Sequence, residues 1–364
     1  ARADDLMMRP TFIAALLELW TGSAATAVTT LTALHDELIE RGQEGIAPLA
    51  SAFIVWAYLW TGDFAAAARV AEQAEDAAAL LDDQAVLATG RTASALVHAH
   101  DGQTERARAE AVQALDLYTG LRWASALIWP SWALGVAALC DGDHEYARSL
   151  LGPLAEQVSA MGAVDPIVGL FVPDNIEALI ALGEEEQAQR LLQWFEGRAV
   201  ALDADWALAL TARCKAALAA RAGDIEAASA AFEVALAAHD RSSIEFERAR
   251  TLLLAGRCYR RAKRRRAAVG ALSEAAELFD KLGASGWAVR AHAELNRVGR
   301  RTAGADALTE SERLIAELAA SGLTNRQVAE HAFVSIKTVE ANLTRVYRKL
   351  GVRSRVGLAN TLQR

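Results

Sequence analysis

The chain has 364 residues, of which 53% are hydrophobic and 6% aromatic, and its formal net charge is −8. This length accommodates two or three ordinary domains, or one elongated repeat domain with a smaller companion. Alanine and leucine dominate, only 6 prolines occur, and the β-branched and aromatic runs typical of strands are scarce. The composition therefore favours an all-α protein and excludes a fold built mainly from sheets.

The N-terminus and the cysteines indicate where the protein works. The first residues, ARADDLMMRP, lack the basic and apolar blocks of a secretion signal, and no run of eighteen or more uncharged apolar residues occurs. Cys140, Cys214 and Cys258 lie far apart without a C-x-x-C pair, which argues against disulfides and against zinc. We therefore expect a cytoplasmic protein with no membrane contact and with reduced, buried cysteines. Because the chain begins at Ala rather than Met, it is interpreted as the C-terminal piece of something longer.

Glycines recur along most of the chain, each followed five residues later by alanine, as in WTGDFAAAA and RAGDIEAA. The intervals between them are 40, 40, 40, 41 and 40 residues. A seventh copy has Lys263 at the glycine position and Ala268 five residues later. The six glycines are Gly22, Gly62, Gly102, Gly142, Gly183 and Gly223.

This periodicity predicts helical hairpins. An apolar run precedes each glycine, which supplies the left-handed backbone that ends a helix, and an amphipathic run follows it. A single hairpin cannot cover its apolar faces, so about seven hairpins of 40 residues should stack into a curved solenoid with a concave surface. The pattern resembles the tetratricopeptide-like class, although its unit is longer than usual. We assign this α-solenoid to residues 1–298 and a small, polar linker to 299–307.

Residues 308–364 predict a second, helical domain. Thr309 and Thr324 begin capping boxes with Glu312 and Gln327, and Ser335 is an N-cap. The helix after Ser335 has an apolar stripe, and its opposite face is polar and cationic. A short helix, a tight turn and such a longer helix are typical of a helix-turn-helix, whose second helix lies in the major groove of DNA. The stripe consists of Val339, Leu343, Val346 and Leu350.

The segment LTESERLIAELAASGLTNRQVAEHAFVSIKTVEANLTRVYRKLGVRSR closely resembles the LuxR-type, or GerE-type, helix-turn-helix. That pattern runs L-T-x-x-E, G-x-x-N-x-x-I/V-A, S-x-K-T-V and K-L-G-V-x-S-R. One departure is Asn342, where the family commonly has histidine. The resemblance implies a four-helix DNA-binding domain that binds double-stranded DNA as a homodimer. With the repeats, the chain resembles the C-terminal half of the large ATP-binding LuxR-family regulators, whose NTPase module is not in this sequence.

The resemblance also implies roles for individual residues. With 335–349 as the recognition helix, the positions that face base edges are Glu340, Ala341 and Thr344. Those that hold phosphates are Lys337, Thr338, Arg345, Arg348 and Arg353. Candidate dimer contacts on the last helix are Val356, Ala359 and Leu362. A glutamate among the base-facing residues is chemically reasonable, because it accepts a hydrogen bond from the amino group of cytosine.

Charge separates the two domains. Residues 308–364 contain nine basic and five acidic side chains, a net charge of +4, which leaves −12 on the rest of the chain. Within the solenoid, the basic run Arg260 to Arg266 has two interpretations, a patch for DNA or an acidic partner and a solvated turn, of which the second is favoured. Trp123, Trp129 and Trp132 are likewise candidates for stacking on a small effector, although packing between helices is the more frequent use.

No feature of the sequence predicts catalysis. There is no nucleotide-binding loop and no convincing grouping of Ser, His and Asp. His98 and His100 point away from each other on a helix, so no metal or cofactor is predicted. We expect a sequence-specific transcription regulator of the bacterial cytoplasm, associated with the nucleoid when bound to DNA, whose solenoid senses a small-molecule effector or a protein partner. The alternative is a protein-interaction scaffold whose DNA-binding domain mainly localises it.

Overall fold

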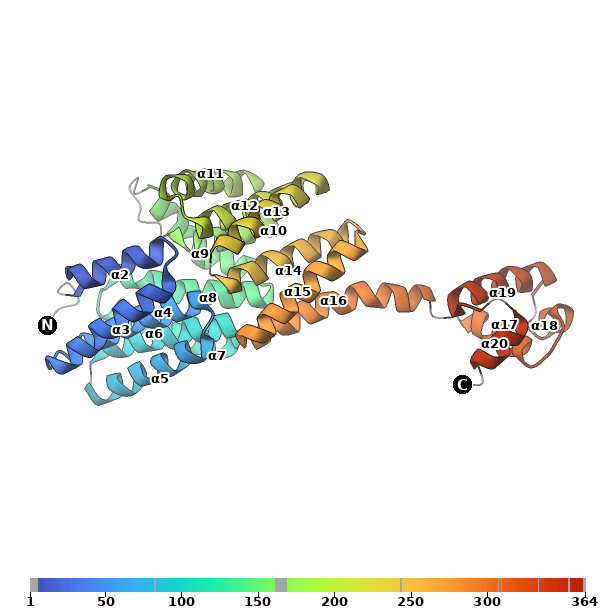
Figure 1. The fold of residues 1–364 in the computed structure, drawn as a ribbon, viewed down its shortest axis with the longest axis horizontal. Coiled ribbons are helices and arrows are strands. Elements are labelled where there is room, and N and C mark those ends of the chain that lie inside the picture. The colour runs from blue at the N-terminus through green and yellow to red at the C-terminus, as the bar shows by residue number, and fades with distance from the viewer. Residues whose placement is uncertain are drawn as a thin grey trace. The chain divides into compact units, whose positions relative to one another are not determined.

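The computed structural model has the predicted all-α architecture (Figure 1). It describes residues 6–362 except 82, 161–168, 243, 307, 309, 333 and 353, and these described residues contain no strand. The chain divides into two compact units, Ala1–Glu294 and Leu295–Arg364. Each unit is described by itself below.

The first unit is a stack of helical hairpins (Figure 1). Its described residues form seven hairpins, each made of a first and a second helix, and the helix α16 (Ser285–Asp306) follows them. A short 3-10 turn, η1 (Ala124–Leu127), precedes the fourth hairpin. The hairpins are α2 (Pro10–Trp20) with α3 (Ala24–Glu40), α4 (Ala47–Thr61) with α5 (Phe64–Leu81), α6 (Gln84–Asp101) with α7 (Thr104–Gly120), α8 (Ile128–Asp141) with α9 (His144–Ala160), α10 (Val172–Leu182) with α11 (Glu185–Leu202), α12 (Asp205–Arg221) with α13 (Ile225–Arg241), and α14 (Glu245–Arg261) with α15 (Arg265–Leu282).

The repeated glycines end the first helices as predicted. All six have positive φ, between 79° and 86°. At Gly62 the N–H donates to the carbonyl of Leu59, and the N–H of Asp63 donates to that of Tyr58, so two carbonyls in the last turn of α4 are satisfied. Lys263 occupies the same place in the seventh hairpin with φ 62°, a conformation that is unusual for a residue with a Cβ. The prediction of about seven hairpins in this register is confirmed.

Ion pairs at a regular sequence separation join helices within a hairpin and between neighbouring hairpins. Arg148 reaches Glu184 at 2.9 Å, Arg241 reaches Asp205 at 2.6 Å, and Lys281 reaches Glu245 at 2.9 Å. In each pair the partners are 36 residues apart. The first pair joins the hairpin α8–α9 to the hairpin α10–α11, whereas each of the other two joins the two helices of one hairpin. Because these pairs are partly exposed, each contributes at most about 1 kcal/mol.

Contacts between distant hairpins close the stack on itself. The indole Nε1 of Trp206 donates to the carbonyl of Trp20 at 2.8 Å, and that of Trp287 donates to the carbonyl of Ala99 at 3.3 Å. These contacts join α2 to α12 and α6 to α16, which lie five hairpins apart. An open solenoid has only nearest-neighbour contacts. Here the first helices meet across the axis, and their side chains fill the interior of the superhelix.

One stretch of the described residues, Ala124–Asp141, is long and apolar enough to cross a membrane. It comprises η1 and α8, and 56% of it is buried inside the solenoid, where α8 packs against α6, α7 and α9. Its apolar composition is thus accounted for by its place in the core.

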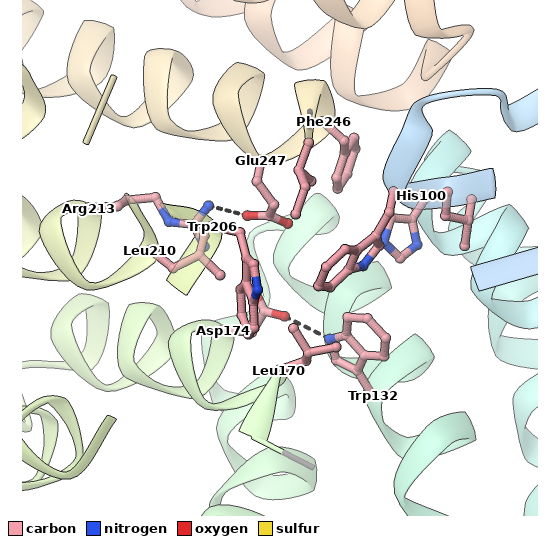
Figure 2. Close-up of a pocket in the computed structure, with 12 residues that line it drawn as sticks. His100, Trp132, Leu170, Asp174, Trp206, Leu210, Arg213, Phe246 and Glu247 are labelled. Carbon is pink, nitrogen blue, oxygen red and sulfur yellow. Dashed lines mark hydrogen bonds and ion pairs between the residues drawn. The ribbon is translucent and has the colours of Figure 1, made fainter. Parts of the chain in front are cut away.

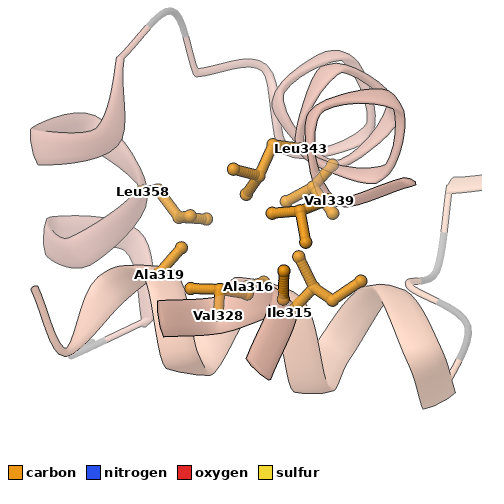
Figure 3. Close-up of a cluster of buried hydrophobic side chains, with 9 residues drawn as sticks. Ile315, Ala316, Ala319, Val328, Val339, Leu343 and Leu358 are labelled. Atoms are coloured by element: carbon orange, nitrogen blue, oxygen red, sulfur yellow. The ribbon is translucent and has the colours of Figure 1, made fainter. Parts of the chain in front are cut away.

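The second unit contains the predicted four short helices, α17 (Glu310–Ala320), α18 (Asn325–His331), α19 (Ile336–Leu350) and α20 (Arg355–Leu362). Figure 3 shows their shared core, in which all four helices contribute apolar side chains. Three residues of the predicted stripe are buried in it, and Leu350 packs against it. The stretch 299–306 of the predicted linker is helical, because α16 continues to Asp306. The core is formed by Ile315, Ala316, Ala319, Val328, Ala329, Val339, Leu343, Val346 and Leu358.

Candidate functional site

The helix-turn-helix of the second unit consists of α18, a turn and α19. Thr324 and Gln327 form a full capping box at the start of α18, with the N–H of Thr324 donating to Gln327 Oε1 at 2.9 Å. Ser335 caps α19 by accepting from the N–H of Thr338 at 3.1 Å. Gly351, with φ 67°, ends α19. Two of the three predicted helix starts are therefore confirmed, whereas the start at Thr309 lies outside the described residues.

Helix α19, the predicted recognition helix, has one buried and one exposed face. Val339, Leu343 and Val346 point into the core, and the predicted DNA-contacting side chains of α19 are all exposed. Arg353, the remaining predicted phosphate contact, lies outside the described residues. The exposed set is Lys337, Thr338, Glu340, Ala341, Thr344, Arg345 and Arg348.

Glu340 lies in the middle of the exposed face. Within the described part of the chain, no side chain forms a hydrogen bond or ion pair with its carboxylate, and the Thr344 hydroxyl donates to its backbone carbonyl at 2.9 Å. The carboxylate is thus available as an acceptor, and on α19 Lys337 precedes it by about one turn and Arg348 follows it by about two. The exposed face of α19 therefore carries a hydrogen-bond acceptor between basic side chains.

Asn342, the departure from the LuxR pattern, is buried. Its Nδ2 donates to the carbonyl of Thr338 at 2.8 Å, and its Oδ1 accepts from Arg345 Nη2 at 3.1 Å. The side chain therefore does not belong to the exposed face. It positions Arg345, which also lies 3.9 Å from the buried carboxylate of Glu312.

Several residues that the sequence identified only as landmarks of the motif hold the domain together. Glu312 on α17 accepts from Lys349 Nζ on α19 at 2.5 Å. Arg355, at the start of α20, donates to the carbonyl of Ala319 at 3.0 Å and to Asn325 Oδ1 at 2.9 Å, and it also donates to the carbonyl of Leu323. One guanidinium thus fixes the turn between α17 and α18. The motif spacing identified these residues, but their partners follow only from the folded geometry.

The candidate dimer contacts lie on α20. Val356 is 71% exposed and Leu362 39% exposed, and Ala359 is half-buried. Leu358, between them in sequence, is fully buried in the core. The helix therefore presents apolar side chains on its outer face, which is compatible with an interface and leaves the dimer a prediction.

The solenoid has a second candidate site in its interior, here called the central pocket (Figure 2). Its cavity is about 30 Å³, enough for roughly one water molecule. Aromatic rings form much of the wall, and a few polar groups converge on it. The lining comes from the first helices α4, α6, α8, α10, α12 and α14 and the segments before α10 and α14: Leu59, Trp60, His100, Trp132, Leu170, Asp174, Trp206, Leu210, Arg213, Ile244, Phe246 and Glu247.

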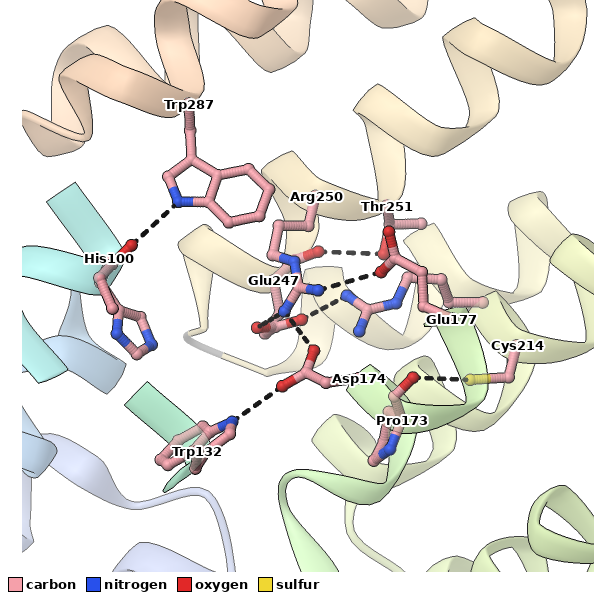
Figure 4. A network of polar contacts seen from close by, with 12 residues as sticks. His100, Trp132, Pro173, Asp174, Glu177, Cys214, Glu247, Arg250, Thr251 and Trp287 are labelled. Atoms are coloured by element: carbon pink, nitrogen blue, oxygen red, sulfur yellow. Dashed lines mark hydrogen bonds and ion pairs between the residues drawn. The ribbon is translucent and has the colours of Figure 1, made fainter. Parts of the chain in front are cut away.

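A network of buried charges lies beside this pocket (Figure 4). The guanidinium of Arg250, only 3% exposed, contacts Asp174 at 2.7 Å, Glu177 at 3.0 Å and Glu247 at 3.1 Å. Arg213 pairs with the other oxygen of Glu247. The network ties α10, α12 and α14 together through groups that would be costly to leave unpaired.

The network and its burial shift several pKa values. Burial raises the pKa of Asp174 despite the opposing charge of Arg250. Burial also acts to raise the pKa of Glu247, but Arg250 and Arg213 together outweigh it and lower this pKa to about 2. Burial lowers the pKa of His100 to about 4, so its ring is neutral at pH 7. Its Nδ1 lies 2.8 Å from the carbonyl of Leu96, which assigns the proton to Nδ1 and leaves Nε2 as an acceptor.

The three candidate effector-binding tryptophans do not form one surface. Trp132 lines the central pocket and donates from Nε1 to Asp174 Oδ2 at 2.8 Å. Trp129 packs beside it, with ring centroids 6.3 Å apart, and contacts Trp56 at 4.9 Å. Trp123 instead packs edge-on against Tyr118 at 5.6 Å, in a separate cluster. Only Trp129 and Trp132 are brought together.

The basic run and the cysteines are also placed. Arg260 pairs with Glu294 at 2.9 Å and Arg264 pairs with Glu226, so part of the run joins neighbouring helices at a turn. The three cysteines are free and buried. Among the described residues, no group of three or more His, Cys, Asp or Glu could hold a metal ion.

Comparisons with known proteins address the two units differently. Against curated proteins, the chain has no match. Among solved structures, it is similar to the crystal structure of a Rap protein complexed with competence and sporulation factor, with 17% sequence identity and a TM-score of 0.47 over 82% of each chain. A likeness of that degree supports no conclusion about the solenoid, whose assignment follows from its own hairpins.

For the second unit, the GerE model of the luxR family of bacterial regulatory proteins matches residues 306–362. The matched stretch contains α17 to α20, the two capped helix starts and the exposed face of α19. Residues 306–362 are therefore a helix-turn-helix domain of the luxR family.

Proposed function

We propose that this protein is a sequence-specific DNA-binding transcription regulator of the bacterial cytoplasm, with 335–349 inserted in the major groove. The proposal rests on the two faces of α19. Its apolar stripe is buried, and its opposite face, which is polar and cationic, is exposed. A helix of this kind, held by a short capped helix in front of it, has the form that reads base edges in DNA.

On this face, charge and acceptor capacity have separate tasks. The DNA phosphates are held by Lys337, Thr338, Arg345, Arg348 and Arg353. These contacts supply affinity but carry no sequence information. The bases are faced by Glu340, Ala341 and Thr344. The glutamate accepts a hydrogen bond from the amino group of cytosine, which favours cytosine over other bases by about 1–3 kcal/mol. The protein binds as a homodimer, with Val356, Ala359 and Leu362 of each copy at the interface, and it associates with the nucleoid when bound.

The solenoid is the sensing arm. Its central pocket is lined from six of the first helices but has room for only about one water molecule, so a small effector would have to part these helices to bind beside Trp132 and the neighbouring Trp129. Such a ligand shifts the equilibrium toward the conformation of the superhelix that it binds more tightly. The alternative is a protein-interaction scaffold whose DNA-binding domain localises it, and the outer surfaces of the stacked hairpins favour that version.

Selection of binding sites from random DNA with the full chain tests the central proposal. Lys337→Ala should weaken binding to all sequences alike and reduce the slope of log affinity against log salt by about 0.9. Glu340→Gln should change the selected sequence while nonspecific affinity stays nearly constant. Lys281→Ala, a change of the same kind on the solenoid, is the control. If the full chain selected no sequence, or bound DNA independently of salt, the proposal would be wrong.

Transcription in a purified system separates the sensing arm from the scaffold. With RNA polymerase, the selected site and small metabolite fractions, a sensing arm should change transcription without another protein. A scaffold should require a protein partner under the same conditions.

A further inference from the structure

A groove between α3, α4 and α5 lies outside both sites described above. Its volume is about 410 Å³, within the range of roughly 300–1,000 Å³ that is usual for binding sites. Most of its lining is apolar. The lining residues are Thr32, His35, Asp36, Ile39, Glu44, Ala47, Pro48, Ser51, Ile54, Tyr58, Val70, Gln73, Ala74, Ala77, Leu80 and Leu81.

The groove is elongated along the helices. Its lining residues recur every three or four positions, from Thr32 to Ile39 on α3 and from Val70 to Leu81 on α5. At a rise of 1.5 Å per residue, these segments extend about 10 and 16 Å, or two to three helical turns. Ser51, Ile54 and Tyr58 of α4 lie between them. The space therefore has the length of a short helix segment.

Large apolar side chains at the groove are exposed to solvent. Leu80 is 87% exposed, Ile39 44% and Leu81 36%. Exposed apolar residues are common when scattered singly, but a cluster around one groove is typical of an interaction site.

The surroundings of the groove are acidic. Asp36 and Glu44 line it, whereas no lysine or arginine does. The sequence from Thr30 to Asp83 contains ten acidic residues and two arginines. One of those arginines, Arg41, is already paired with Glu37 at 2.5 Å. A partner that carried positive charge beside an apolar stripe would complement this surface.

We propose that this groove docks an amphipathic α-helix of a partner protein, with apolar side chains at i, i+3, i+4 and i+7 in the groove and Lys or Arg beside the acidic rim. Helices bind grooves in this way when an apolar face meets a hydrophobic channel of matching length. The acidic groups accelerate the encounter and select against acidic helices. This surface goes beyond the proposed DNA binding and effector sensing, since neither uses α3 or α5.

Fluorescence anisotropy with the full chain tests the proposal. The probe is a fluorescein-labelled peptide of about 14 residues built from leucine and lysine, with leucine along one helix face. It should bind saturably. A peptide with glutamate in place of lysine, and one of scrambled order with the same composition, should each bind at least about tenfold more weakly. Equal binding of all three peptides, or no binding of the first, would overturn the proposal.

Matched variants locate the site. Leu80→Asp should weaken the leucine–lysine peptide about tenfold although it adds a negative charge, because it removes an apolar contact. Val200→Asp adds the same charge at a residue of α11 that is 62% exposed, and it should leave binding unchanged. Both positions are exposed, so both variants should fold, which circular dichroism checks. If Val200→Asp weakened binding as much as Leu80→Asp, binding would be nonspecific and the proposal wrong. DNA binding serves as an independent readout, because failure of the groove leaves the salt dependence and sequence selection of the DNA-binding domain intact.

Discussion

The backbones of Gly102 and Gly286 are in direct contact although 184 residues separate them in the sequence. A Cβ on Gly102 would lie 2.7 Å from the Cα of Gly286, which is closer than such atoms approach in proteins. Beside this contact, the Ser285 N–H and hydroxyl both lie 3.1 Å from an oxygen of Asp101. The turn after α6 is thereby fastened to the start of α16.

Gly286→Ala should therefore loosen the closed superhelix. The added methyl group has no space, so we expect the free energy of unfolding to fall by about 1–3 kcal/mol. Urea denaturation followed by tryptophan fluorescence measures this, because all nine tryptophans precede Leu295 and report only on the solenoid. Gly197→Ala is the control, since a Cβ there meets nothing within 4 Å, and it should be neutral or stabilise by about 0.5–1 kcal/mol. Equal effects of the two variants would show that the contact is not restrictive.

Arg250→Met should be among the most damaging single changes in the solenoid. It removes the shared partner of the buried Asp174 and the partly buried Glu177, and it leaves Glu247 with Arg213 alone, for which the expected loss is about 3–5 kcal/mol. The same denaturation experiment applies. Arg241→Met removes an exposed arginine that pairs with Asp205 and should cost less than about 1 kcal/mol. A loss of that small size in Arg250→Met would mean that the network contributes little to the closed fold.

Stability should fall as the pH drops below neutrality, because two histidines are buried as neutral rings. Burial lowers the pKa of His100 to about 4 and that of His239 to about 3, from 6.5. Below pH 6.5 both histidines become protonated in the unfolded chain, whereas they stay neutral in the folded chain until the pH reaches their lowered pKa. Each histidine should therefore remove about 1.4 kcal/mol per pH unit as the pH falls from 6.5 toward its folded pKa.

His100→Phe isolates one of these contributions. The raised pKa of Asp174 acts in the opposite direction, since its folded form binds a proton more readily and gains stability as the pH falls. Comparison of variants removes this common background. His100→Phe should reduce the slope of stability against pH by about 1.4 kcal/mol per unit below pH 6.5. An unchanged slope in His100→Phe would refute the assignment of a neutral buried ring.

Arg355→Lys should destabilise the DNA-binding domain. Lysine keeps the charge but cannot reach two carbonyls and Asn325 together, and each hydrogen bond from a charged donor is worth about 1.5–3 kcal/mol. Hydrogen exchange of peptides from α18 and α19 reports on this, since the domain has no tryptophan. Arg348→Lys, on the exposed face, should leave exchange unchanged. If both variants exchanged alike, Arg355 would have no special role in the turn.

Features that depend on local chemistry were predictable from the sequence. The spacing of the glycines identified the turns, including the one at Lys263, and the stripe through Val339 and Val346 identified the buried face of α19. Each of these features repeats within a few turns of one helix or between neighbouring hairpins. The N-caps at Thr324 and Ser335 were predictable for the same reason, because each depends on residues within one helical turn.

Features that depend on closure of the superhelix were not predictable. Arg248 and Arg250 lie two residues apart in a run with ordinary charge spacing, yet Arg250 is buried among three carboxylates and Arg248 reaches Asp240 at 2.5 Å near the surface. Their difference depends on Asp174 and Glu177 of α10, which lies two hairpins away from α14. Trp123 and Trp132 similarly separate because η1 lies between them, and sequence proximity alone does not show which ring turns inward.

The closure of the stack also restricts how this architecture can change in evolution. Open solenoids lengthen by duplication of a unit, because each unit needs only its neighbours. Here α2 must meet α12 and α6 must meet α16, so duplication or deletion of a hairpin between them would separate Trp20 from Trp206 and Gly102 from Gly286. Drift in hairpin number is thereby penalised, and new specificities must arise by substitution within a fixed count of hairpins.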